Sequence, residues 1–314
     1  MGKSKIKNWA VNVDKLKVCL NIEDDIYTYL KEHFTRIVNK ENKTIRVLDE
    51  DYFSLHFFDE QDTKMSAILN VKDTDGWLKL GTFVFHCGNK YKNKAFFTYD
   101  NSALYTISTY NYDGTPNNHI CDLSYVVDYY GMSFNNITTV EIAFDSDFNF
   151  IKKIRAMIKN TEHYDLYLNG KKVGNNEILE GYGEYYSRNR LKLQLPTLYF
   201  SQAKDSDMQM KVYDKARELN ESTPYKKEKI KRWLGWNEGI YRVEILFHNT
   251  NIRDYFKRYE DRLPQEMGGH DNVLSLLCIS DFRTAMFVDA CDRLIFFKSK
   301  ITGEKISLLE IAEI

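Results

Sequence analysis

Three separated segments of the chain alternate between apolar residues and residues that are mostly polar. They cover residues 138–145, 208–215 and 241–248. Successive side chains of a β-strand point to opposite faces of its sheet, so a period of two predicts strands with one buried and one polar face. The apolar sides comprise Val140, Ile142, Phe144, Met208, Met210, Val212, Val243, Ile245 and Phe247. The chain is therefore expected to build a sheet whose other face carries ionisable groups.

The rest of the pattern mixes strands and helices. We expect an α+β fold with a central antiparallel sheet and helices, and a small, mainly helical C-terminal unit. The predicted boundary separates residues 1–265 from residues 266–314. Further strands are expected at 11–21, 52–58, 65–71, 77–86, 94–99 and 192–201. Helices are expected at 24–39, 117–130, 149–159 and 252–259, the last with Asn249 as its N-cap, and again from Gly268 onward.

The composition is that of a globular protein without a membrane anchor. Hydrophobic residues make up 43% of the chain and charged residues 28%. No apolar run is long enough to cross a bilayer, and the basic, interrupted N-terminal segment does not match a signal peptide. We therefore expect a cytoplasmic protein. The cysteines show no Cys-x-x-Cys spacing, which predicts reduced and mostly buried thiols at Cys19, Cys87, Cys121, Cys278 and Cys291.

Charge limits how the chain can bind nucleic acid. A formal net charge of −1 argues against a protein that coats DNA, since non-specific binding depends on neutralising phosphates. A site-specific binder needs only a local basic surface. The densest basic run consists of Lys226, Lys227, Lys229, Lys231 and Arg232, beside Trp233 and Trp236. The alternative interpretation of such a run is a solvated helix face.

Acidic residues recur on the polar side of the first and third segments. The pattern Val-Glu-Ile-x-Phe at 140–144 is repeated at 243–247, which suggests that the two strands are neighbours. Carboxylates on neighbouring strands repel each other unless a cation lies between them. Oxygen ligands suit Mg²⁺ or Mn²⁺, so Glu141, Asp145 and Glu244 are candidate metal ligands. The alternative is that these side chains face water.

The middle segment places Tyr213 on the same polar side, with Lys211 and Lys215 as neighbours. A tyrosine on a strand is more often a packing residue than a nucleophile, so the spacing makes Tyr213 a candidate only. A catalytic role requires its phenol to converge with at least two acidic side chains on one face of the sheet. A buried phenol, or one turned away from them, would contradict that role.

Five short motifs occur in a fixed order in the second half of the chain. They are Thr-Thr-Val-Glu-Ile-Ala-Phe-Asp at 138–145, Leu-Tyr-Phe at 198–200, Asp-Ser-Asp at 205–207, Met-Lys-Val-Tyr-Asp-Lys at 210–215 and Tyr-Arg-Val-Glu-Ile at 241–245. This set resembles the replication initiation factor family of small rolling-circle plasmids and some phages. The match covers roughly residues 138–255, and the N-terminal third is similar only in being rich in strands.

The resemblance implies a sheet related to the HUH endonuclease fold. It implies Tyr213 as the nucleophile and Glu141 and Glu244 as metal ligands, with Asp145 as a further candidate. The chain lacks a His-hydrophobe-His pair, in which it agrees with this subfamily and departs from the broader HUH class. Thr139, Glu141 and Ser201 stand where the family usually has Arg, Asp and Gly. These departures affect the fine geometry of the site and its contacts with DNA.

The implied function is rolling-circle DNA replication initiation, in which a metal-dependent nickase cuts one strand of an origin. Tyr213 would attack the scissile phosphate, giving a covalent 5′-phosphotyrosine and a free 3′-hydroxyl, and the strand would later be rejoined. Lys211 or Lys215 would favour the phenolate by charge, because a free tyrosine with a pKa of ~10 is mostly protonated at neutral pH. Mg²⁺ or Mn²⁺ would act as the Lewis acid.

Origin DNA, single-stranded or as a hairpin, is the expected partner, together with a helicase and a polymerase from the host or the element. No membrane partner is expected, and homodimerisation is left open. The candidate DNA contacts are Lys226, Lys227, Lys229, Lys231, Arg232 and Arg242. Trp233 and Trp236 either stack on unpaired bases or are buried.

Three other functions compete with the nickase. A plasmid mobilisation relaxase would use the same chemistry, but relaxases usually show a histidine cluster, and this chain has only isolated histidines. A non-catalytic DNA-binding regulator on the same fold would bind DNA without cutting it. A structural, strand-rich protein with chance matches would not bind DNA at all.

Overall fold

The structure is a computed structural model that describes residues 6–32, 35–38, 44–61, 64–73, 76–86, 91–110, 114, 116–173, 184–185, 195–200, 208–260 and 272–313. The chain divides into two compact units built from separated stretches. The first comprises Met1–Val13, Glu141–Asn251 and Ser280–Ile314, and the second Asp14–Val140 and Ile252–Ile279. Strands β1 (Trp9–Asn21) and β10 (Ser133–Ser146) supply residues to both. The predicted boundary at residues 265 and 266 lies outside the described residues.

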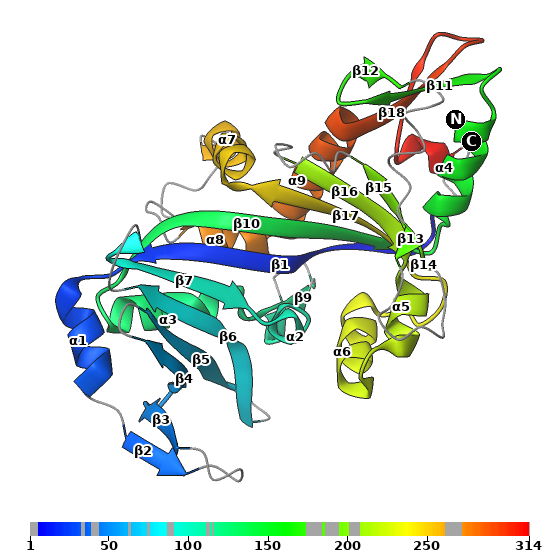
Figure 1. Ribbon diagram of the computed structural model, residues 1–314. Coiled ribbons are helices and arrows are strands. Elements are labelled where there is room, and N and C mark those ends of the chain that lie inside the picture. The colour runs from blue at the N-terminus through cyan, green and yellow to red at the C-terminus, as the bar shows by residue number, and fades with distance from the viewer. Residues whose placement is uncertain are drawn as a thin grey trace. The chain divides into compact units, whose positions relative to one another are not determined.

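The first unit contains the strand order β15-β16-β17-β10-β1 (Figure 1). Its other strands are β15 (Leu198–Phe200), β16 (Met208–Asp214) and β17 (Tyr241–His248), and β16 pairs antiparallel with both β15 and β17. The apolar positions of the sequence alternation are buried in the structure. Those that are fully buried include Met210, Val212, Val243, Ile245 and Phe247. The three predicted strands and the neighbouring positions of β10 and β17 are therefore confirmed.

The helices of the first unit are α4 (Phe150–Lys159), α5 (Lys215–Glu221), α6 (Pro224–Leu234) and α9 (Ser280–Leu294). The predicted helix at 149–159 is confirmed, and Asn149 caps it by accepting a hydrogen bond from the Lys152 amide at 2.9 Å. Helix α6 begins with a proline after the capping residue Thr223 and ends at Gly235, whose φ of 79° is readily adopted by glycine.

A second sheet of the first unit has the order β12-β11-β18-β19. Its strands are β11 (Tyr164–Leu168), β12 (Lys171–Lys172), β18 (Ile295–Ser299) and β19 (Lys305–Ser307), and a 3₁₀ turn, η4 (Glu310–Ala312), follows them. The short pair β13 (Glu184–Tyr185) and β14 (Leu195–Pro196) is separate. The expected C-terminal helices are present, but β18 and β19 follow them. These strands form because β18 pairs with the distant β11, a contact that no local pattern signals.

The second unit contains the strand order β10-β1-β7-β6-β5-β4-β3-β2, and its pairs from β1 and β7 to β2 and β3 are antiparallel. Its strands are β2 (Thr35–Val38), β3 (Thr44–Asp49), β4 (Phe53–Gln61), β5 (Lys64–Asp73), β6 (Gly76–His86) and β7 (Lys94–Tyr99), with the small pair β8 (Thr109–Tyr110) and β9 (Pro116–Asn117). The strands predicted at 52–58, 65–71, 77–86 and 94–99 correspond to β4, β5, β6 and β7 and are confirmed.

The helices that lie wholly in the second unit are α1 (Asp24–Glu32), α2 (Asn101–Leu104), the 3₁₀ turn η2 (His119–Cys121), α3 (Asp122–Tyr129) and α8 (Asn272–Cys278). Helix α7 (Asn249–Glu260) begins in the first unit and ends in the second. The predicted helix 24–39 is too long, because α1 ends at Glu32 and the β-branched stretch Thr-Arg-Ile-Val forms β2 instead. No helix in the described part of the chain is long and apolar enough to span a membrane.

Candidate active site

The polar face of the first unit's main sheet gathers side chains from three neighbouring strands. In the antiparallel register of β16 and β17, Lys211 lies opposite Glu244 and Tyr213 opposite Arg242. Directly paired residues of neighbouring strands point to the same face. Strand β10, which carries Glu141 and Asp145, lies on the other side of β17. The arrangement brings together the tyrosine, the lysine and the three acidic residues that the period of two predicts.

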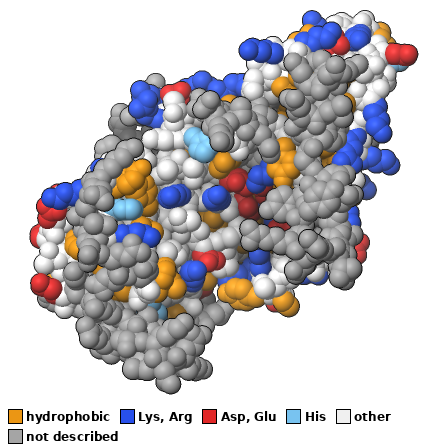
Figure 2. All heavy atoms as spheres, in the orientation of Figure 1, with side chains coloured by type: hydrophobic (Ala, Val, Ile, Leu, Met, Phe, Trp, Pro, Cys, Tyr) orange, Lys and Arg blue, Asp and Glu red, His pale blue; other side chains and the backbone are white. Residues whose placement is uncertain are grey.

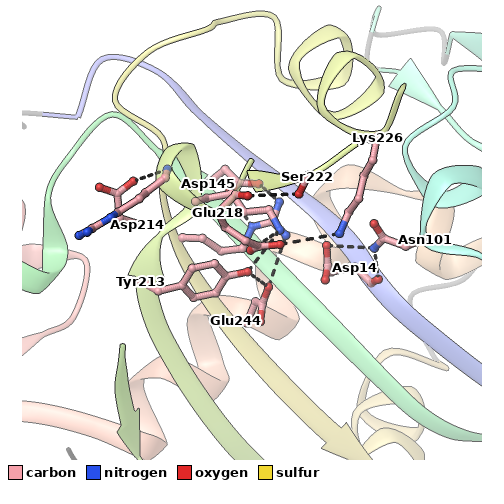
Figure 3. A network of polar contacts seen from close by, with 12 residues as sticks. Asp14, Asn101, Asp145, Tyr213, Asp214, Glu218, Ser222, Lys226 and Glu244 are labelled. Atoms are coloured by element: carbon pink, nitrogen blue, oxygen red, sulfur yellow. Dashed lines mark hydrogen bonds and ion pairs between the residues drawn. The ribbon is translucent and has the colours of Figure 1, made fainter. Parts of the chain in front are cut away.

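Tyr213 lies at the centre of this face. Its hydroxyl donates a hydrogen bond to Glu244 Oε1, and the Nζ atom of Lys215 donates to the same hydroxyl at 3.4 Å. Figure 3 shows the phenol and the Glu244 side chain pointing toward each other. The side chain is buried, at 8% exposure, which counts against the catalytic role by the criterion stated above, whereas the second requirement, convergence with acidic side chains on one face, is met.

Glu141 and Glu244 form a carboxylate pair bridged by Lys211. The Nζ atom of Lys211 lies 3.0 Å from Glu141 Oε1 and 2.8 Å from Glu244 Oε2. Ligand oxygens of the two glutamates lie within 4.8 Å of one another. Burial alone would lower the pKa of Lys211, but the charges of Glu244 and Glu141 and the hydrogen bonds to them raise that pKa above its ordinary value. A cation therefore already lies between the two carboxylates at neutral pH.

Asp145 and Arg242 form a second, fully enclosed ion pair. Arg242 Nε and Nη2 each donate to one Asp145 oxygen at 2.7 Å, a bidentate geometry. Arg242 Nη1 also lies 3.4 Å from Glu244 Oε1, the oxygen that accepts from Tyr213. Both side chains of the pair are almost entirely buried. Arg242 is thus placed to orient Glu244, and it has no exposed surface with which to contact DNA.

Helix α5 supplies a further partner of Tyr213. Lys215 was expected at the end of the strand but begins this helix, which Asp214 caps by accepting from the Arg217 amide at 3.0 Å. The Lys215 side chain is 2% exposed, and its ammonium nitrogen lies 2.9 Å from Glu218 Oε2. Lys226 of α6 approaches the other Glu218 oxygen at 3.7 Å, and Figure 3 shows this contact. No sequence pattern predicts the contact of Glu218 with Lys215.

The basic residues of α6 do not share one direction. Lys227, Lys231 and Arg232 line an open hollow of about 570 Å³ together with Pro224, Glu228, Gly235 and Asn237. Lys229 Nζ instead lies 4.5 Å from the ring centre of Tyr225. Figure 2 shows Lys and Arg side chains in several separate groups on the face it presents. Trp233 is buried at 6% exposure, as one of the two sequence interpretations expected.

The Asp-Ser-Asp motif at 205–207 and Ser201 lie outside the described residues. Asp14, which carries no motif, belongs to the second unit, where its carboxylate accepts from the Tyr105 hydroxyl at 2.7 Å and from Asn101 Nδ2 at 3.3 Å.

Comparisons with known proteins include a similarity to a solved structure. No protein-family model and no curated protein sequence matches the chain. Among solved structures, the chain is similar to a rolling circle replication initiator protein from Geobacillus stearothermophilus, with a TM-score of 0.47 and 13% sequence identity. The similarity covers 94% of this chain and 89% of that chain.

Proposed function

We propose that the protein is a rolling-circle DNA replication initiator that nicks one strand of its origin with Tyr213 as the nucleophile. The observation that carries the proposal is the position of the Tyr213 hydroxyl, which is hydrogen-bonded to Glu244 and to Lys215. A phenol that lies between a carboxylate, which can accept its proton, and an ammonium group, which stabilises negative charge, is suited to attack as phenolate. The resemblance of the motifs to the replication initiation factor family suggests that this phenol attacks a DNA phosphate.

In the proposed step, the Tyr213 oxygen attacks the scissile phosphorus while its proton passes to Glu244. The new bond joins the phenol oxygen to phosphorus, and the bond from phosphorus to the 3′-oxygen breaks. The leaving oxygen takes a proton from solvent and becomes the free 3′-hydroxyl. Lys215 stabilises the negative charge on the phenol oxygen, and Glu218 holds Lys215 in place. The reverse step rejoins the strand without a nucleotide cofactor, since the phosphotyrosine conserves the ester energy.

A divalent cation fits the carboxylate pair of Glu141 and Glu244. Both side chains are nearly buried and present oxygens to one point, where the Lys211 ammonium stands in for a cation. Bound Mg²⁺ or Mn²⁺ would act as a Lewis acid on the phosphate. We leave Asp145 out of the proposed ligand pair because Arg242 engages both of its oxygens, and we assign this pair the role of orienting Glu244.

The near-burial of Tyr213 sets a condition on the reaction. A phosphate can reach the phenol oxygen only after the surrounding side chains rearrange, because 8% of the tyrosine is exposed. Lys215 and Glu218 lie on α5, and Lys226, next to Glu218, lies on α6. We propose that DNA bound along the basic residues of α6 competes for Lys226 and loosens this cover.

The test incubates the full-length protein with Mn²⁺ or Mg²⁺ and a labelled single strand from its own replicon. We expect strand cleavage and a covalent adduct, with the DNA attached to the peptide that contains Tyr213. Tyr213→Phe should abolish both products and leave DNA affinity nearly unchanged. Tyr167→Phe is the matched control, because that tyrosine lies on β11, where it stacks on Phe296. Undiminished cleavage by Tyr213→Phe would remove Tyr213 from the mechanism, and DNA binding without any cleavage would favour the regulator.

A further inference from the structure

Two cysteines from distant parts of the chain meet in the second unit. Cys121 ends η2 and Cys278 ends α8, and their Sγ atoms lie 3.3 Å apart across 157 positions of sequence. Neither cysteine forms a disulfide in the structure. A disulfide bond is about 2.05 Å long, so the sulfurs need to approach by only about 1.3 Å to be joined. Sequence spacing predicts separate thiols here, because it cannot show a contact of this range.

The surroundings of Cys121 make it the more reactive member of the pair. It is half-buried, whereas Cys278 is 8% exposed, so reagents reach Cys121 first. The Ser275 hydroxyl lies 3.9 Å from its sulfur. The hydrogen bond from Cys278 is the main cause that lowers the pKa of Cys121 to about 7. Burial, by contrast, raises the pKa of the Cys19 and Cys291 thiols.

We propose that Cys121 and Cys278 form a redox-active thiol pair, in which Cys121 is oxidised by a peroxide and Cys278 resolves it as an intramolecular disulfide. The Cys121 thiolate attacks one peroxide oxygen, the O–O bond breaks, and the sulfur loses two electrons to give sulfenic acid while the second oxygen leaves as water. The Cys278 sulfur then attacks the sulfenic sulfur, forming the S–S bond and releasing a second water. A dithiol reductant returns two electrons and two protons and restores both thiols.

The bond would close a loop of 157 positions within one unit. A cross-link of this span removes conformational freedom mainly from the unfolded chain. The oxidised protein should therefore unfold at a higher temperature than the reduced protein. Cys121 and Cys278 both belong to the second unit, whereas Tyr213, Glu244 and Lys215 belong to the first. The proposal thus does not depend on the nicking function.

The experiment treats the reduced full-length protein with a small excess of hydrogen peroxide and alkylates it with N-ethylmaleimide. The protein is then digested without reductant for mass spectrometry. We expect one dominant linked peptide that joins Cys121 to Cys278, a loss of two free thiols per chain, and full reversal by dithiothreitol. Iodoacetamide at pH 7 should alkylate Cys121 roughly tenfold faster than Cys19, since the thiolate fraction is larger.

Two variants identify the roles of the sulfurs. In Cys278→Ser, Cys121 should stop at the sulfenic acid, which dimedone traps, and no linked peptide should form. Cys291→Ser is the matched control, and it should give the same linked peptide as the parent protein. The proposal is overturned if the parent protein accumulates over-oxidised Cys121 without the link, or if other cysteines form the dominant disulfide. Both of these outcomes are measured on the parent protein, so they test the proposal even if a variant folds poorly.

Discussion

At the scale of single residues, Lys211 decides how the carboxylate pair can be used. Its ammonium bridges Glu141 and Glu244 at 3.0 and 2.8 Å, and both carboxylates are nearly buried. Two such charges without a cation would repel each other and resist ionisation. Lys211 therefore offsets the repulsion within the pair, and a divalent cation has to compete with its ammonium.

This competition gives a prediction for Lys211→Gln. Removal of the ammonium leaves two carboxylates whose repulsion a divalent ion can offset, so Mn²⁺ should bind about tenfold more tightly. The measurement is a Mn²⁺ titration followed by electron paramagnetic resonance. Lys215→Gln is the control, since Lys215 contacts Tyr213 and Glu218 and neither member of the pair. Weaker Mn²⁺ binding by Lys211→Gln would show that the lysine supports the metal and does not compete with it.

The enclosed pair of Asp145 and Arg242 gives a prediction for stability. Asp145→Asn leaves the Arg242 guanidinium buried with its bidentate partner gone, which should lower the free energy of unfolding by about 3–5 kcal/mol. Asp289→Asn serves as the control, because Asp289 pairs with Arg293 at 2.9 Å on the exposed side of α9. That change should stay within about 0.5 kcal/mol. Urea unfolding measures both, and equal effects would mean that the enclosed pair contributes no more than a surface pair.

At the scale of elements, helix α6 carries the proposed phosphate contacts. Changing Lys227, Lys231 and Arg232 to glutamine neutralises the basic side of the hollow that they line. If each contacts one phosphate, the slope of log affinity against log salt should become shallower by about 2–3. Fluorescence anisotropy over a range of salt measures the slope. The same change at Lys152, Lys153 and Lys159 on α4 is the control, and an equal effect there would show that only total charge matters.

At Gly81, strand β6 has no room for a side chain. Gly81 pairs with Leu69 on β5 and Tyr99 on β7, and a Cβ atom at this position would collide with the Thr98 carbonyl oxygen and the Phe97 ring. Gly81→Ala should therefore lower the free energy of unfolding by about 1–3 kcal/mol. Thr82→Ala, on the same strand and half-buried, should cost less than about 1 kcal/mol. Thermal unfolding compares the two, and a neutral Gly81→Ala would mean that β6 and β7 separate easily.

At the scale of the whole molecule, local periodicity could predict most strands, because alternation is a property of adjacent residues. It placed Glu141, Lys211, Tyr213 and Glu244 on one face, and the register of β16 with β17 agrees. It could not predict β18, whose partner β11 lies far away in the sequence. The contact between Lys215 and the Tyr213 hydroxyl was also beyond it, since Lys215 begins α5 and does not continue the strand.

The arrangement of the first unit has a consequence for protein synthesis. Strands β1 and β10 both contact late residues, since Arg283 Nε donates to the Val11 carbonyl at 3.2 Å and the Phe287 ring stacks on Phe144 of β10 with 5.1 Å between ring centres. During translation, Tyr213 leaves the ribosome before Ser280–Ile314 have been synthesised. The unit that holds the phenol cannot close until translation of α9 is finished.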